Sequence, residues 1–380
     1  MTNTLADKLA AFDPNLPLSN AHTIPSQWYI DPEVHDAERH AIFGSTWQAL
    51  GRADQVAEPG SFFTIDLAGD PILVLRDQQG ILRAFYNVCR HKASQVINET
   101  QGKLTKLRCR YHGWTYDLAG ALRGTPEFDG VEGFCREHNG LVPLAVEAWG
   151  PLVFVNAAPS NQIKPLVDFL APLPDRTANL GLEHLWFVQR REYEIACNWK
   201  VFVDNYLDGG YHVNTVHPAL AGALDYSRYR TEIIGNTSVQ SSPIIPSDDP
   251  AIAKVRTGDH AYYWWIFPNL MINMYSGVMD ANVVLPLGPE RCKVIFDFYF
   301  ARTDGPDARQ FIDQSMAVAH QVQLEDGEVC EQVQRGLRSR SYSTGRFSVR
   351  REAAGYHFHR LLASRLQAAC GQTPAKENSR

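Results

Sequence analysis

Two short segments, each with one cysteine and one histidine, constrain the possible folds of this chain more than any other feature of its sequence. Cys89 and His91 are separated by one residue, Cys109 and His112 by two, and 17 residues lie between the two pairs. Two thiolates suit one ferric iron and two neutral imidazoles suit a second, and the imidazoles raise the reduction potential of such a cluster. The spacing therefore indicates a 2Fe-2S cluster held by Cys89, His91, Cys109 and His112.

A structural zinc ion is the alternative interpretation of these four side chains. Two cysteines and two histidines are a frequent ligand set for tetrahedral zinc. Zinc folds usually take one pair of cysteines and one pair of histidines, whereas each pair in this chain contains one of each. We therefore expect an iron cluster rather than zinc.

The pattern of apolar residues predicts two domains. The 380 residues exceed the ~250–300 at which a single core stops growing. Between about 47 and 156, short apolar runs alternate with Gly, Pro, Asp and Asn, which is typical of a small all-β unit. Beyond it, helical segments such as 196–213 accompany a strand pair over 281–287 and 292–300. We expect an α+β fold.

Bulk composition and charge argue against some classes of partner. The net charge of −6 and the sequence pI of about 6.1 make nucleic acid and anionic membrane surfaces poor partners. The first residues show no basic stretch followed by an apolar one, and no run approaches the ~20 apolar residues of a membrane span. We expect a cytoplasmic protein whose seven cysteines are reduced thiols or metal ligands.

A second metal site is indicated by His212 and His217, which lie five residues apart. On an ideal helix this spacing separates them by about 140°, so they converge only if the helix bends or ends. Gly209 and Gly210 offer that freedom. Two imidazoles and one carboxylate form the ligand set of non-haem Fe(II) oxygenases. The best candidate for the carboxylate is Asp326, and its competitors are Glu325, Glu328 and Glu331.

Several segments of the chain resemble one known family, the α subunits of Rieske non-haem iron ring-hydroxylating oxygenases. The resemblance spans roughly 45–365, and its later segments are similar to the choline-oxidising branch. The segments that carry it are NVCRHKAS, CRYHGWTYDLAGAL, GLVPLAVEAWGPLVFVN, NWKVFVDNYLDGGYHVNTVH, FPNLMIN, VVLPLGPERCKVIFDFYF and QLEDGEVCEQVQRGL. The cluster spacing is highly specific for this superfamily, and the later segments are less specific.

The resemblance implies a domain organisation. A helical lead-in over 1–45 is expected to pack on the catalytic domain, and a Rieske domain is expected over 46–160. A catalytic domain of antiparallel sheet and helices, similar to a helix-grip fold, is expected over 161–370, with a tail over 371–380.

The resemblance also implies roles for particular residues. His212, His217 and Asp326 would hold mononuclear Fe(II), and Asn205 would lie near it. In the family, an acid before the first of these histidines links the metal sites of neighbouring subunits. Many members place that acid three residues before the histidine, where this chain has Gly209, so we expect Asp208 to take the role, with Asp204 as the rival.

Electron supply and assembly follow from the same resemblance. No G-x-G-x-x-G follows a strand in the sequence, so electrons would come from a separate reductase or ferredoxin. Dioxygen and a small molecule would be the substrates. Because the metal sites within one subunit of the family are too far apart for fast transfer, a homotrimer is expected.

Three functions remain open from the sequence. The first is a monooxygenase that hydroxylates or N-demethylates choline or another quaternary or tertiary amine. Tyr263, Trp265 and Tyr206 are candidate pocket residues, because aromatic faces attract such cations. An aromatic-ring hydroxylating oxygenase would use the same rings, and the third alternative is an electron-transfer Rieske protein without oxygenase activity.

Overall fold

The computed structural model describes residues 4–217, 224–245 and 258–372, and these residues form two compact units. One unit is Phe43–Phe169, and the other combines Met1–Ile42 with Leu170–Arg380. Both contain antiparallel sheets, and the second adds long helices, which confirms the expected α+β class. The domain boundaries expected at 45, 160 and 370 stay predictions, and the expected tail lies outside the described residues from 373 onwards.

The unit Phe43–Phe169 is built from short antiparallel strands. A seven-stranded sheet has the order β1-β10-β9-β4-β3-β2-β5, and a separate three-stranded sheet has the order β6-β7-β8. The strands are β1 Gln48–Arg52, β2 Ser61–Leu67, β3 Asp70–Arg76, β4 Leu82–Tyr86, β5 Gln101–Lys103, β6 Leu107–Arg108, β7 Thr115–Tyr116, β8 Leu122–Gly124, β9 Pro143–Trp149 and β10 Leu152–Asn156. Short helical turns are η2 Ala53–Val56, η3 Arg136–Asn139 and η4 Ser160–Gln162, and α4 Leu166–Leu170 follows.

The core of this unit continues directly into the predicted cluster site. Phe62, Leu73 and Phe85 from the large sheet are buried in one cluster with Cys89 and Cys109. The two thiols are therefore held by the same apolar packing that stabilises the sheet.

The second unit is organised around one seven-stranded antiparallel sheet. Its order is β11-β17-β16-β15-β14-β13-β12, so every strand pairs with its neighbour in sequence except β11, which closes against β17. The strands are β11 Trp186–Ile195, β12 Arg230–Ile234, β13 Thr237–Pro243, β14 His260–Ile266, β15 Leu270–Tyr275, β16 Val278–Gly288 and β17 Arg291–Phe300. The strand pair expected over 281–287 and 292–300 is confirmed as β16 and β17.

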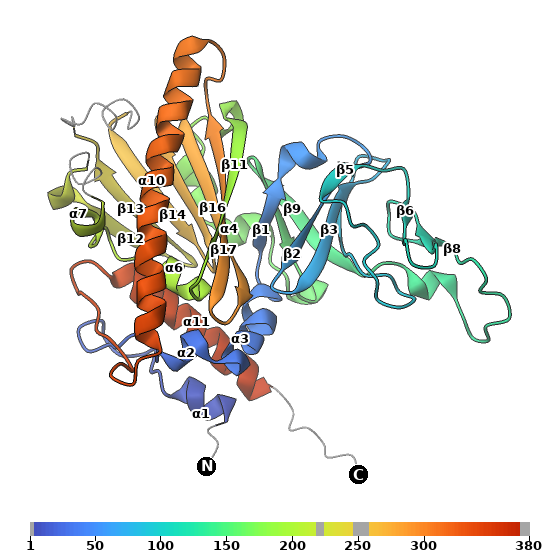
Figure 1. Cartoon of the computed structure of the whole chain (residues 1–380), viewed down its shortest axis with the longest axis horizontal. Coiled ribbons are helices and arrows are strands. Elements are labelled where there is room, and N and C mark those ends of the chain that lie inside the picture. Colours follow the sequence, from blue (N-terminus) through green and yellow to red (C-terminus); the bar gives the residue numbers. More distant parts are fainter. Residues whose placement is uncertain (1–3, 218–223, 246–257, 373–380) are drawn as a thin grey trace. The chain divides into compact units, whose positions relative to one another are not determined.

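Helices accompany this sheet (Figure 1). They are α1 Leu5–Ala10, α2 Gln27–Ile30, α3 Pro32–Glu38, η1 Arg39–Phe43, α5 Leu173–Thr177, η5 Leu182–His184, α6 Trp199–Tyr206, α7 Val213–Val216, η6 Tyr226–Arg228, α10 Pro306–Leu337 and α11 Ala353–Gln372. Helix α10 contacts α6 and β11, α6 contacts β16 and β17, and α11 contacts α6 and β12. None of the described helices is long and apolar enough to cross a membrane.

Helix α10 presents a regular buried stripe to the rest of the unit. Met316, Gln323, Cys330 and Leu337 are buried at intervals of seven residues, which places them on one face of the helix. Asp326 lies one turn after Gln323 and is therefore directed to the same side. The apolar pattern thus determines which way this carboxylate faces.

Helix α6 is fixed in position by a buried ion pair. Lys200 Nζ lies 2.6 Å from Glu38 Oε1, and neither side chain is exposed to solvent. The indole nitrogen of Trp199 donates to the other oxygen of Glu38 at 2.8 Å. Burial lowers the pKa of Lys200, and the charge of Glu38 opposes that shift. Removing one partner of such a pair costs about 3–5 kcal/mol, so α3 holds α6 firmly.

The helix expected over 196–213 is wrong as a single element, because α6 ends at Tyr206. Gly209 and Gly210 both have positive φ, at 69° and 71°, which a continuing helix excludes. A Cβ at Gly209 would lie 2.2 Å from the carbonyl oxygen of Arg351. The chain then starts the short helix α7, with His212 and His217 at its two ends.

Candidate metal centres and substrate cavity

The four predicted cluster ligands lie on two loops with matching backbone hydrogen bonds. The N–H of Cys89 and that of Cys109 each donate to the carbonyl five residues on, at 2.8 Å in both loops. Each cysteine carbonyl accepts from the N–H four residues on, at Ala93 and Gly113, at 3.0 Å. Those two residues have positive φ, at 56° and 74°, so the two loops share the same backbone conformation at this position.

The side chains on these loops fit a two-iron cluster. Both thiols are buried, and the rings of His91 and His112 lie 4.5 Å apart between centroids. His91 Nδ1 is buried and has no hydrogen-bond partner within the described chain, as a nitrogen reserved for a metal would. Burial and then the nearby His112 lower the pKa of His91, which favours the neutral, ligating form.

A single zinc ion fits these side chains less well. We searched the described residues for groups of three or more histidine, cysteine and acidic side chains whose ligand atoms lie within 4.8 Å of one another. The group that meets this criterion is His212, His217 and Asp326. The four cluster residues do not converge in that way, as one tetrahedral ion would require. Cysteines at one end and imidazoles at the other suit two separate irons.

A tyrosine beside the cluster site was not expected from the sequence. The hydroxyl of Tyr116 lies 3.3 Å from Cys89 Sγ and accepts the backbone N–H of Arg90 at 3.1 Å. Burial and the contact with Cys89 raise its pKa, so it remains a hydroxyl. Hydrogen bonds to the sulfurs are among the interactions that set a cluster's potential.

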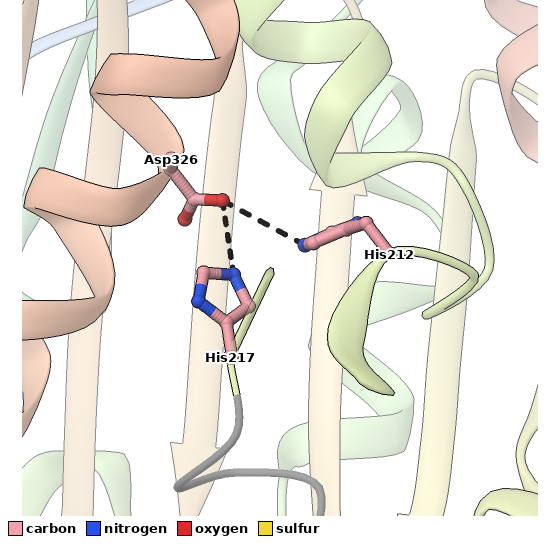
Figure 2. A group of neighbouring side chains, drawn as sticks. All are labelled: His212, His217 and Asp326. Carbon is pink, nitrogen blue, oxygen red and sulfur yellow. Dashed lines mark hydrogen bonds and ion pairs between the residues drawn. The ribbon is translucent and has the colours of Figure 1, made fainter. Parts of the chain in front are cut away.

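The second site brings together the three predicted Fe(II) ligands. Asp326 Oδ1 lies 3.1 Å from His217 Nε2 and 3.6 Å from His212 Nε2. Figure 2 shows the carboxylate facing both rings. Both histidines come from the ends of α7, and Asp326 comes from α10. The three ligand atoms thus form one face with the 2-His-1-carboxylate composition of non-haem iron sites.

Two further carboxylates determine how the imidazoles are turned. His212 Nδ1 lies 2.5 Å from Asp208 Oδ2, and His217 Nδ1 lies 2.6 Å from Glu325 Oε2. A carboxylate that accepts a hydrogen bond from Nδ1–H keeps the proton on that nitrogen and leaves the Nε2 lone pair free for a metal. Burial disfavours protonation of His217, but its hydrogen bonds to Asp326 and Glu325 outweigh burial and raise its pKa.

The three competitors of Asp326 have other partners. Glu325 holds His217 from the Nδ1 side, opposite to the nitrogen that faces Asp326. Glu328 accepts from Gln332 at 3.1 Å, and Glu331 accepts the backbone N–H of Ala196 at 3.1 Å. Asn205 donates to Asp326 Oδ1 at 2.7 Å and so fixes this carboxylate. The geometry therefore favours Asp326 as the third ligand.

The two aspartates considered for the link between metal sites have different surroundings. Asp204 accepts from the hydroxyl of Tyr29 at 2.6 Å and lies 2.8 Å from His359 Nε2, so it joins α6 to neighbouring helices. Asp208 contacts the iron-ligand candidate His212 directly. An acid at position 209 is excluded by the close approach of Arg351, which explains why the acid stands four residues before His212.

A cavity of about 130 Å³ adjoins the three Fe(II) ligand candidates. It is lined by side chains from α6, α10 and the sheet face between β13 and β17. The candidate pocket residues Tyr206 and Tyr263 line it, together with Tyr229 and Tyr275. Trp265 is not part of the lining: it is fully buried and packs edge-on against Phe267, His357 and Phe358.

One end of the cavity has a polar network centred on a buried carboxylate. Asp280 Oδ2 accepts from Asn273 at 2.7 Å, and Asn273 Oδ1 accepts from the hydroxyl of Tyr206 at 2.8 Å. Burial and then the charge of Asp280 raise the pKa of Tyr206 well above its ordinary value. Burial and then Tyr263 do the same for Tyr229. The cavity therefore combines neutral tyrosine rings with negative charge.

Two cavity residues of β15 were missed from the sequence although a signal exists. Met271 and Asn273 alternate with Tyr275 along this strand, and all three line the cavity. Polar or aromatic residues at every second position of a buried strand indicate a face that lines a site rather than the core. Glu325 was considered only as a ligand, and its contact with His217 Nδ1 was not foreseen.

Comparison with protein-family models identifies both domains. Residues 46–135 match the Rieske [2Fe-2S] domain, and residues 182–368 match the ring hydroxylating alpha subunit (catalytic domain). The expectation of a Rieske cluster and a mononuclear iron is thereby confirmed. The alternative of an electron carrier without oxygenase activity is set aside, because the second match is a catalytic domain.

Individual relatives match over almost the whole chain. The chloroplastic choline monooxygenase of Arabidopsis thaliana is 40% identical over 371 residues, which span 94% of this chain and 86% of that protein. The carnitine monooxygenase oxygenase subunit of Acinetobacter pittii (strain PHEA-2) is 29% identical, and the match spans 89% of this chain and 92% of that protein.

A solved structure agrees with these relatives. It is a quaternary ammonium Rieske monooxygenase, described with insights into carnitine oxidation by gut microbiota and inter-subunit electron transfer. It matches with a TM-score of 0.81 and 28% identity, covering 95% of this chain and 98% of that one. The chain therefore belongs to the Rieske non-haem iron oxygenases, as an α subunit with a Rieske [2Fe-2S] domain and a ring-hydroxylating catalytic domain.

Proposed function

We propose that this chain is the oxygenase component of a monooxygenase that hydroxylates or N-demethylates a choline-like quaternary or tertiary amine. One observation carries the proposal. The convergent His212, His217 and Asp326 open onto a cavity that contains four tyrosine rings and the buried carboxylate of Asp280. Aromatic faces and a negative charge both stabilise a desolvated cation. The names of the choline and carnitine monooxygenases point to the same substrate class.

The proposed site roles follow the contacts described above. Cys89, Cys109, His91 and His112 hold the Rieske cluster, and His212, His217 and Asp326 hold the mononuclear iron. When bound, the cluster supplies electrons one at a time and the mononuclear iron supplies dioxygen activation.

The protein's own groups position these ligands. Asn205 fixes Asp326, while Asp208 and Glu325 each accept a hydrogen bond from an imidazole Nδ1 and so orient His212 and His217. Fixed ligands keep one face of the site open to substrate and to the cavity.

Electron delivery is proposed to require partners. A separate reductase or ferredoxin reduces the cluster, and Asp208 links His212 to the Rieske histidine of a neighbouring subunit in a homotrimer. The contact of Asp208 with His212 and the inter-subunit electron transfer described for the quaternary ammonium monooxygenase support this arrangement. We also propose domain boundaries at 45, 160 and 370 and a cytoplasmic location.

Turnover of candidate substrates tests the proposed function. Purified protein with a compatible reductase should consume one O2 per molecule of product with choline or a related quaternary or tertiary amine. Benzoate should give no product, because the carboxylate of Asp280 in the cavity lining disfavours a second carboxylate beside it. Oxygen uptake and product are measured together. Turnover of benzoate without turnover of any amine would instead establish aromatic-ring hydroxylation.

The Asp326→Ala variant tests the mononuclear site. Loss of the anionic ligand should reduce the iron content from about three atoms per chain to about two and lower turnover by about 100-fold or more. The visible and electron paramagnetic resonance spectra of the cluster should be unchanged. Glu328→Ala on the same helix is the matched control, because Glu328 contacts only Gln332 among the hydrogen bonds described. Loss of both metals, or of neither, contradicts the assignment.

The Asp208→Asn variant tests the proposed link between subunits. Both metals should bind, and the reductase should still reduce the cluster. Reoxidation of the cluster by O2 and substrate should slow by about 100-fold, since a neutral amide oxygen accepts a weaker hydrogen bond from an imidazole N–H than a charged carboxylate does. Stopped-flow absorbance measures that rate. If Asp208→Asn is fully active and Asp204→Asn is not, the role belongs to Asp204.

A further inference from the structure

We infer that the side-chain amides of Asn282 and Gln323 bind a hydroxyl group of the substrate and so select amino alcohols among the amines. The inference rests on the proposed function, because it concerns the cavity in which the amine would bind. Asn282 lies on β16 and Gln323 on α10, and both line the cavity beside the Fe(II) ligand candidates.

Each of these two buried amides has one atom without a hydrogen-bond partner, whereas the other amides that line the cavity are bonded. Asn282 and Gln323 are 2% and 3% exposed. Asn282 Oδ1 and Gln323 Nε2 are buried atoms with no hydrogen-bond partner within the described chain. The other cavity amides are bonded: Asn205 donates to Asp326, Asn273 bridges Tyr206 and Asp280, and Gln240 bridges Tyr229 and Tyr206.

A buried polar atom without a partner lowers stability, so a ligand that supplies the missing hydrogen bond gains affinity. One open atom accepts hydrogen bonds and the other donates them. A hydroxyl can satisfy both at once, because it donates one hydrogen bond and accepts others. A trimethylammonium group can satisfy neither, and a carboxylate can satisfy only the donor.

Asn282 and Gln323 lie where they can contact a substrate that is held beside the metal ligands. Gln323 lies three residues before Asp326, so both project from the same side of α10. Asn282 pairs with Met271 and Phe296 on the adjacent strands, and both of these residues also line the cavity. The two amides therefore approach the cavity from the helix layer and from the sheet.

Binding of three related quaternary ammonium compounds tests the inference. Choline has a hydroxyl, ethyltrimethylammonium has a hydrogen in its place, and glycine betaine has a carboxylate at the corresponding end. Metal-loaded full-length protein is titrated with each compound by calorimetry without oxygen. Choline should bind at least about tenfold more tightly than ethyltrimethylammonium, because a site built for a hydroxyl rejects ligands that lack it. Glycine betaine should also bind more weakly, but repulsion by Asp280 contributes there, so the comparison with ethyltrimethylammonium is the deciding one.

Apolar variants of similar size test the residues themselves. Asn282→Leu and Gln323→Met should each weaken choline binding by about tenfold and leave ethyltrimethylammonium binding unchanged or tighter. Both variants should keep or raise the melting temperature, because they remove an unsatisfied buried group. Asn269→Leu is the matched control, because Asn269 is a buried amide outside the cavity lining that donates to the carbonyl of Val284: the variant should lower the melting temperature and preserve the preference for choline.

The outcomes separate this inference from the proposed function. If the wild-type protein binds choline and ethyltrimethylammonium equally, the inference is overturned while the substrate class stands. An unchanged choline preference in both apolar variants also overturns it. If none of the three compounds binds, the proposed substrate class fails and the inference fails with it.

Discussion

The catalytic domain depends on the convergence of two imidazoles on one carboxylate. Asp326 Oδ1 lies 3.1 Å from His217 Nε2 and 3.6 Å from His212 Nε2. This convergence requires that each ring turns its Nε2 inwards, and the contacts of Asp208 and Glu325 with the Nδ1 atoms enforce that orientation. Two histidines alone would not make the site, because an imidazole can turn either nitrogen to a metal.

The backbone between α6 and α7 makes this geometry accessible. Positive φ at Gly209 and Gly210 ends α6, and the carbonyl of Arg351 occupies the space in which a side chain at 209 would lie. Helix α6 is in turn held by the buried pair of Lys200 and Glu38. The position of the metal ligands therefore depends on contacts with segments at both ends of the chain.

The sequence predicted the local features and missed those that depend on distant segments. The cluster ligands lie within 24 residues, and their spacing alone indicated their chemistry. Asp326 was singled out by resemblance, because spacing could not separate it from Glu325 on the same helix. Tyr263 and Trp265 alternate onto one face of β14, yet α11 covers only Trp265, through Phe358 and His357. Alternation along a strand predicts which residues share a face of the sheet, but it does not predict which of them a helix will cover.

A single-turnover experiment tests most directly whether the two metal centres serve one reaction. Hydroxylation of one C–H bond by O2 consumes two electrons and two protons and releases one water. Fully reduced protein is separated from its reductase and mixed with O2 and choline. The amount of product and the electron paramagnetic resonance signal of the reduced cluster are then followed together. We predict that up to one product per chain forms in step with loss of that signal. Cluster oxidation without product, or product without cluster oxidation, would contradict the account.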